Sequence, residues 1–243
     1  MNLIYNVIVL FFLFSFSKTE SASPLVYSCN DDTKTSNTTQ ISRNIDNLLS
    51  KLVAGAVRKG FVTASSGEAE AQVYGLSQCR GDVSKTNCSI CIQEAAKDLR
   101  EQCPDQSDAR VWFDYCFLTY KPSKFFGQVD FSSGDGIYFS NVENVKNKRV
   151  FSRKLGELMD KITSEAVRPS QKGFGKGKSV ISSLVTLYAL VQCTEDLSGI
   201  NCARCVGTAV GDFTRFCNNK EGCRVLYNGC FVRYELYPFF FPL

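Results

Sequence analysis

Apolar side chains recur with helical spacing early in each half of the chain. Four of them between positions 45 and 52 stand at i, i+3, i+4 and i+7, and the same spacing returns between positions 155 and 162. That period places the four side chains on one face of a helix, so both segments are predicted to be amphipathic helices. The residues are Ile45, Leu48, Leu49 and Leu52, then Leu155, Leu158, Met159 and Ile162.

A second helix is predicted in each half, starting near the cysteine pairs Cys88/Cys91 and Cys202/Cys205, which lie on its apolar stripe. Other short segments are rich in β-branched and aromatic residues and are predicted to be paired strands. They are residues 61–65, 71–79, 109–115 and 116–121 in the first half, and 223–227 and 230–236 in the second.

The two halves are copies of one unit. Five cysteines of the first half meet five of the second at a constant separation of 114 residues, and the spacing C-x8-C-x2-C occurs in both. Upstream the separation is 110, so the second copy holds four extra residues, which we place in the Gly/Lys-rich segment 171–179. We interpret that segment as a mobile basic loop.

The chain is therefore predicted to contain two tandem α+β modules, each an antiparallel sheet packed on two helices. Residues 24–121 form the first module, residues 122–136 the linker and residues 137–240 the second module.

Residues 1–23 are predicted to be a secretory signal peptide, because the apolar run from Leu3 to Phe16 is followed by small polar residues. The alternative is an uncleaved signal anchor. We expect no other membrane span.

Cysteine usage indicates an oxidising compartment. Twelve cysteines and a sequon at Asn37, a predicted glycosylation site, are typical of a secreted chain. A thioredoxin-like redox pair would need exposed cysteines in a βαβ setting. A zinc site would need free thiolates, and an oxidising compartment converts thiols to disulfides. Because the central cysteines fall on the inward stripe of a helix, we favour structural disulfides over both alternatives.

Differences between the copies bear on the cysteine pairing. Cys29 has no cysteine counterpart in the second module, where Phe139 or a neighbour stands, and Cys223 has none in the first. If Cys103 pairs with Cys29, then Cys217 needs another partner, which Cys223 supplies. The four remaining cysteines of each module allow three pairings.

The doubled cysteine motif and the ending CFVRYELYPFF resemble the plant cysteine-rich repeat secretory proteins, which are built from ginkbilobin-type (salt-stress/antifungal) domains. The resemblance implies a secreted, apoplastic protein and a five-stranded sheet on two helices in each module. The same tandem forms the outer part of cysteine-rich receptor-like kinases and plasmodesmata-located proteins. The implied pairs are Cys29–Cys103, Cys79–Cys88, Cys91–Cys116, Cys193–Cys202, Cys205–Cys230 and Cys217–Cys223.

The resemblance also implies a mannose-type sugar site made of an Asn, an Arg and a Glu, whose groups suit vicinal hydroxyls. In the first module Asn30 and Arg110 match, but Lys121 stands at the Glu position. In the second module Arg224 and Glu235 match, and no Cys-Asn pair is found there. Both trios are therefore expected to be incomplete.

Enzymatic chemistry is not favoured. The chain has no histidine, which excludes Ser-His-Asp and Cys-His catalysis, and disulfides would leave no thiol nucleophile. The segment GFGKGKS does not match a phosphate-binding loop, since Lys172 stands where glycine is required. We expect no cofactor and no bound metal.

Charge is unequal between the halves. Residues 24–137 carry 12 basic and 14 acidic side chains, whereas residues 138–243 carry 15 and 9. The basic half suits anionic cell-wall polysaccharide or a microbial membrane surface, and nucleic acid is not an expected partner. Two hypotheses follow: a defence-associated, antifungal lectin-like protein for mannose-type or wall glycans, and an interaction module that docks receptor-like kinase ectodomains or a second copy of itself.

Overall fold

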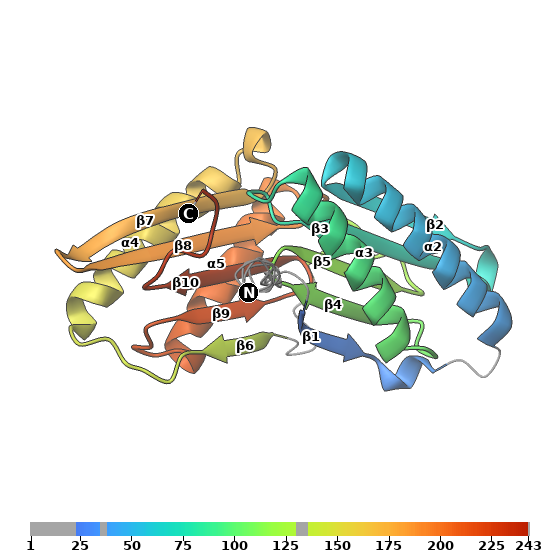
Figure 1. Ribbon diagram of the computed structural model, residues 1–243, viewed down its shortest axis with the longest axis horizontal. Coiled ribbons are helices and arrows are strands. Elements are labelled where there is room, and N and C mark those ends of the chain that lie inside the picture. Colours follow the sequence, from blue (N-terminus) through green and yellow to red (C-terminus); the bar gives the residue numbers. More distant parts are fainter. Residues whose placement is uncertain (1–22, 35–37, 130–135, 243) are drawn as a thin grey trace, which may run out of the picture.

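The computed structural model describes residues 23–34, 38–129 and 136–242. The predicted signal peptide, except Ser23, and the predicted glycosylation site Asn37 lie outside the described residues. Two five-stranded antiparallel sheets lie side by side, and each is covered on one face by two helices (Figure 1). The predicted fold class is confirmed.

The first module has the strand order β1-β4-β5-β3-β2. Its long helix α2 buries the face predicted from the helical spacing, with Leu48 and Leu52 fully buried. Helix α3 begins after Ser84, whose hydroxyl accepts the N–H of Asn87 at 3.1 Å. The elements are β1 (Pro24–Cys29), η2 (Asp31–Thr33), α2 (Thr38–Lys59), β2 (Phe61–Ser66), η3 (Ala69–Ala71), β3 (Val73–Cys79), α3 (Lys85–Gln102), β4 (Ala109–Phe113) and β5 (Cys116–Lys121).

The second module repeats this order as β6-β9-β10-β8-β7. Ser198 caps α5 as Ser84 caps α3, accepting the N–H of Asn201 at 3.2 Å. The elements are β6 (Ile137–Ser140), α4 (Lys148–Ala166), η4 (Pro169–Gln171), β7 (Phe174–Ser182), β8 (Val185–Cys193), α5 (Gly199–Phe216), β9 (Cys223–Leu226) and β10 (Cys230–Glu235).

All twelve cysteines are joined in disulfides, and the pairs are those that the resemblance implied. Four of the bridges attach the inner face of α3 or α5 to the neighbouring strands, where each contributes about 2–4 kcal/mol. The bridges are Cys29–Cys103, Cys79–Cys88, Cys91–Cys116, Cys193–Cys202, Cys205–Cys230 and Cys217–Cys223.

The prediction of a mobile loop at GFGKGKS was wrong, because this segment is most of strand β7. Its glycines let the strand lie directly against α4. A Cβ atom on Gly175 would stand 2.1 Å from the carbonyl oxygen of Ile162, and one on Gly177 would stand 3.0 Å from Leu158 Cδ1. Small residues are therefore required by close packing here, not by flexibility.

The four extra residues of the second copy are divided between two places. Gly60 and Gly173 are equivalent, since each accepts a 2.8 Å hydrogen bond from the cysteine that ends the neighbouring strand. Three residues separate Gly60 from the buried alanine near the end of α2, whereas six separate Gly173 from the equivalent alanine of α4. Three extra residues thus form the turn containing η4, ahead of most of the predicted segment, and the fourth lies in the β7–β8 hairpin.

Two glutamines join the modules through reciprocal hydrogen bonds. Gln78 Nε2 donates to the carbonyl of Cys193 at 3.0 Å, and Gln192 Nε2 donates to that of Cys79 at 3.1 Å. Both side chains are buried. Each bond becomes the other when every residue is replaced by its equivalent in the other module, so the two modules are related by an approximate two-fold axis. Their side-chain oxygens accept the backbone N–H groups of Glu195 and Gly81 at 2.9 and 3.0 Å.

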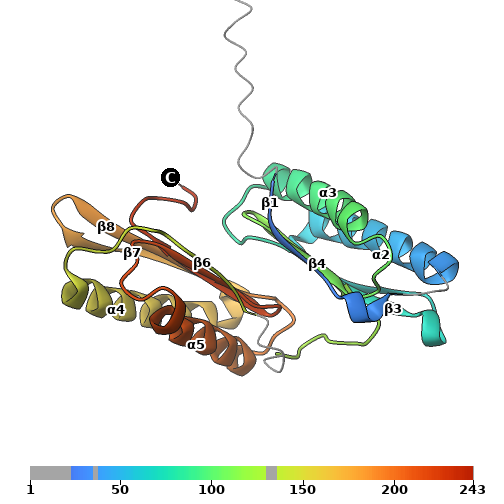
Figure 2. The same cartoon turned by 90° about the horizontal axis from the view of Figure 1, so that it is seen from below.

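Apolar side chains surround this contact. They come from the sheet faces that the helices leave uncovered, and the two helix layers lie on opposite outer sides of the molecule (Figure 2). The rings of Trp112 and Phe117 lie 5.0 Å apart within the cluster. Its buried members are Leu76, Trp112, Phe117 and Leu226.

The segment after the last strand of each module crosses to the other module. In the predicted linker, Gly127 N donates to Asp196 Oδ2 of the second module at 2.7 Å. In the C-terminal segment, Phe241 N donates to Asp82 Oδ2 of the first at 2.6 Å. The residues of both pairs are 114 apart, so the described part of the linker is bound structure that follows the two-fold relation.

Replacing Gly175 with alanine is expected to destabilise the protein by about 1–3 kcal/mol, because the new methyl group overlaps the backbone of α4. Urea unfolding of the disulfide-intact protein measures this loss. Gly156→Ala is the control, since a Cβ at Gly156 meets nothing within 4 Å. Alanine there is expected to add about 0.5–1 kcal/mol through helix propensity. Equal effects of the two substitutions would contradict the packing of β7 on α4.

Gln192→Ala is expected to lower the free energy of unfolding by about 1–3 kcal/mol, because it leaves the buried carbonyl of Cys79 and the part-buried N–H of Gly81 without partners. Gln78→Ala is expected to cost about the same through the equivalent groups. The control is Gln93→Ala on the exposed side of α3, where the amide bonds only to Ser89. Urea unfolding should show a change there within about 0.5 kcal/mol. A smaller loss at Gln192 than at Gln93 would contradict the reciprocal contact.

Candidate functional site

The two arginines predicted to bind sugar lie at the module interface. Arg110 Nη1 donates to Asn228 Oδ1 of the second module at 2.6 Å, and its guanidinium lies 5.4 Å from the ring centroid of Trp112. Arg224 Nη1 lies 2.7 Å from Asp114 Oδ1 of the first module. Arg110 and Arg224 are 114 residues apart, and so are their partners Asn228 and Asp114. The two contacts are therefore equivalent under the two-fold relation.

Asp114 organises a chain of charges that runs into the second module. It accepts Arg224 and, at 3.4 Å, Nη1 of Arg233. The Nε atom of Arg233 is bound to Glu235 Oε1 at 2.9 Å, and its guanidinium also lies over the ring of Phe239. Arg233 therefore links the carboxylate of one module to that of the other.

Burial and charge act in opposite directions on Arg224. Burial lowers the pKa of its guanidinium from the ordinary value, whereas the nearby carboxylate of Asp114 raises that pKa. An arginine stays protonated in proteins, so the ion pair compensates for the cost of taking this charge out of water. The contact is best described as a partly buried ion pair between modules.

The second module has an Asn that the sequence comparison missed. Ser140 pairs with Cys223 on the edge of the sheet, as Cys29 pairs with Ala109 in the first module, so Asn141 is the equivalent of Asn30. Its Nδ2 donates to Glu235 Oε2 at 3.4 Å. This module has no Cys-Asn pair, as expected from the sequence, but the strand register places an Asn at the equivalent position.

Asn141 was missed in the sequence because the Asn was expected directly after a cysteine. The cysteine of the first copy is replaced by Ser140, and the separation here is 111 residues, which differs both from the 110 of the first helices and from the 114 of the shared cysteines. Gly222 is also part of this arrangement, because a side chain there would collide with Glu235 and with Asn141. Strand register, which the sequence alone does not give, was needed to find the residue.

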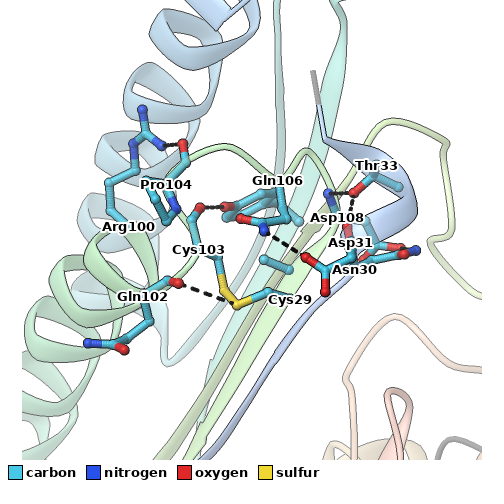
Figure 3. The surroundings of a disulfide bond; sticks show 12 residues. Cys29, Asn30, Asp31, Thr33, Arg100, Gln102, Cys103, Pro104, Gln106 and Asp108 are labelled. Carbon is cyan, nitrogen blue, oxygen red and sulfur yellow. Dashed lines mark hydrogen bonds between the residues drawn. A yellow bond between two sulfur atoms is a disulfide. The ribbon is translucent and has the colours of Figure 1, made fainter. Parts of the chain in front are cut away.

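The first module arranges its candidates differently. Asn30 is exposed beside the Cys29–Cys103 disulfide (Figure 3). Its side-chain oxygen accepts the N–H of Asp32 at 3.1 Å. Its Nδ2 donates to Asp108 Oδ2 at 3.4 Å. Arg110 is directed to the second module instead, and Lys121 occupies the position of Glu235. The first module therefore does not assemble the predicted trio.

Two other kinds of site were sought in the described ranges. Among those residues, no three His, Cys, Asp or Glu side chains are grouped closely enough to hold a metal ion. No helix within the same ranges has the length and apolar character needed to cross a membrane.

Comparisons with known proteins agree with this architecture. A family described as "Salt stress response/antifungal" matches residues 28–123 and 139–237. Cysteine-rich repeat secretory protein 55 of Arabidopsis thaliana is 52% identical over 88% of this chain and 82% of its own length. An antimicrobial ginkbilobin-2-like protein of Castanea crenata is 38% identical over 90% of this chain and 89% of its own.

A solved structure has the same tandem. The tandem DUF26 ectodomain of the Arabidopsis thaliana cysteine-rich receptor-like protein PDLP8 superposes with a TM-score of 0.76 at 27% identity, covering 90% of this chain and all of that one. The family matches cover both modules, and the secretory relatives cover most of the chain. The chain therefore belongs to the salt stress response/antifungal family and carries two tandem copies of its domain.

Proposed function

We propose that this protein is a secreted, apoplastic, non-enzymatic binding protein of the stress and antifungal response, which acts by docking to other extracellular proteins. All twelve cysteines are in disulfides, so none is available as a nucleophile. The chain also contains no histidine for general acid–base chemistry. Its chemistry favours recognition through surfaces.

One observation supports docking over sugar binding: the arginines assigned to sugar are engaged inside the molecule. Arg110 is 9% exposed, and the side chain of Arg224 is 12% exposed. A sugar that reached Arg224 would have to displace Asp114 from a 2.7 Å contact. Breaking this partly buried ion pair leaves a charge uncompensated, which opposes binding of an uncharged sugar.

The β7–β8 hairpin offers a contact surface for docking. Leu184 at its turn is 93% exposed and Val180 is 64% exposed, although each is a large apolar residue. The hairpin extends away from the first module (Figure 1). Receptor-like relatives share the tandem, so we propose the ectodomain of a cysteine-rich receptor-like kinase as the partner of this surface.

A second candidate function is supported by the site in the second module. Asn141, Arg224 and Glu235 together provide the amide, guanidinium and carboxylate that the resemblance requires for a mannose-type sugar. Donors and acceptors in that set suit a pair of vicinal hydroxyl groups. The protein would then be lectin-like, with one sugar site in the second module.

Two measurements on the secreted protein distinguish these functions: a mannose-type glycan array, and surface plasmon resonance with a cysteine-rich receptor-like kinase ectodomain of the same plant. Docking predicts a blank array and saturable ectodomain binding, weakened about tenfold or more by Leu184→Asp because a charge replaces an apolar contact. Ile200→Asp is the control, since Ile200 on α5 is 75% exposed and lies outside the hairpin. It should leave the affinity unchanged.

The opposite outcome supports the lectin. In that case mannose-type glycans bind, and Glu235→Gln abolishes their binding while Leu184→Asp does not. Ectodomain binding that is equally sensitive to Leu184→Asp and Ile200→Asp would contradict the hairpin as the docking surface.

A further inference from the structure

A cleft of about 380 Å³ lies between the modules, away from the Asn141–Arg224–Glu235 site. Its walls are the last turn of α2, the first turn of α3 and the inserted turn that contains η4. Its lining also includes Gln192, which is one of the two interface glutamines. The volume is in the range of pockets that bind small molecules, at about 300–1,000 Å³.

Positive charge gathers around this cleft. The lining residues include five basic side chains and one acidic side chain, Glu195. Arg80 is neutralised by a bidentate contact with Asp82 at 2.6 and 3.1 Å, and Lys172 lies 3.5 Å from Glu195. The other basic residues lining the cleft are Arg58, Lys59 and Lys85.

These three residues lack acidic partners. In the part of the chain that the structure describes, no carboxylate lies within ion-pair distance of Arg58, Lys59 or Lys85. All three are exposed, so their charges reach the solvent in the cleft. The cleft therefore has a local excess of positive charge that can attract an anion.

Helix stability explains only part of this charge. Arg58 and Lys59 occupy the last turn of α2, where cations interact favourably with the helix dipole. Lys85 is in the first turn of α3, which has no acidic residue, and a cation there opposes the dipole. The equivalent residue of the second module is Gly199. The positive charge at Lys85 is thus specific to the cleft and unfavourable for its helix.

Lys172 also lies in an unfavourable local conformation. Its backbone is left-handed, with φ 51° and ψ 39°, which side chains other than glycine adopt rarely. The residue belongs to the turn before Gly173, which is three residues longer than the corresponding segment of the first module. The longer turn thus closes one wall of the cleft and holds Lys172 there at a conformational cost.

We propose that this cleft binds a carboxylated oligosaccharide, that is, an oligomer of uronic acid. Lysine ammonium groups on separate walls match carboxylates on successive sugar rings, because each acts as an independent point charge. Val57, Val83 and Phe174 in the lining provide apolar surface for the C–H faces of the rings. Compact phosphate ligands are less suited, since they favour donors that converge on one point. The site is separate from the docking hairpin and does not depend on the proposed function.

Isothermal titration calorimetry with trigalacturonate tests the proposal on the full secreted protein. The expected result is saturable one-to-one binding, weakened about tenfold in the double variant Lys59→Ala/Lys85→Ala because two charge contacts are lost. The matched control is Lys148→Ala/Lys161→Ala, which removes the same charge from exposed positions on α4. Its affinity should stay within about twofold of the parent protein.

Lys172→Gly separates binding from folding. Glycine adopts the left-handed conformation without strain, so stability to urea should not fall, whereas the affinity for trigalacturonate should fall several-fold. Fully methyl-esterified trigalacturonate, which has the same rings without charge, should not bind. Raising NaCl from about 0.05 to about 0.5 M should weaken trigalacturonate binding, since salt screens exposed charges.

Four outcomes would overturn the proposal. They are no saturable binding of trigalacturonate, equal loss in the cleft variant and the α4 control, equal affinity for the methyl ester, and pyrophosphate binding as tightly as trigalacturonate. Ectodomain binding is measured on the same variants. It should be unchanged by Lys59→Ala/Lys85→Ala, so a failure of this site and a failure of the docking function give different results.

Discussion

Two buried amide side chains fix how the halves of the molecule meet. Gln78 and Gln192 each insert into the other module and find there both a carbonyl and an N–H group. Leaving a buried polar group without a partner costs about 1–3 kcal/mol, so any other arrangement of the modules would leave several such groups unsatisfied. The contact uses one face of each sheet, and helices cover the other. The surfaces left for ligands are the sheet edges, the hairpins, the clefts and the outer faces of the helices.

The elements of the fold could be predicted from the sequence because their causes are local. The helical spacing at Leu48 and Leu52, like the strand patterns, lies within a single segment. Each segment's own pattern is therefore enough to predict its secondary structure and its buried face. The sequence shows that Gln78 and Gln192 are identical residues 114 apart. It does not show that they lie at the module interface, because a contact between modules produces no periodic pattern along the chain. For GFGKGKS, composition suggested a loop, whereas the approach of α4 makes the same glycines necessary in a strand.

The candidate site was harder to predict because its members are joined by register and by the interface. Arg224 and Glu235 were recognised from short motifs, but their partner Asp114 comes from the other module and their partner Asn141 directly follows the edge strand β6. Asn141 was hidden by the replacement of the preceding cysteine with Ser140. Motif spacing describes neighbours along the chain, and here the chemistry depends on neighbours across strands and between modules.

Comparison of the copies separates structural residues from candidates for recognition. Residues that are identical in both copies, such as Asp82 and Asp196, hold the crossing segments and are required by the two-fold contact. Some residues that differ lie outside those contacts, although Asp114 and Asn228 differ and both take part in them. Glu235 stands where the first copy has Lys121, and Lys172 lies in a turn that is longer than in the first copy. Because the shared contacts already fix the fold, the ligand preferences of the two modules can diverge at such positions without loss of the common architecture.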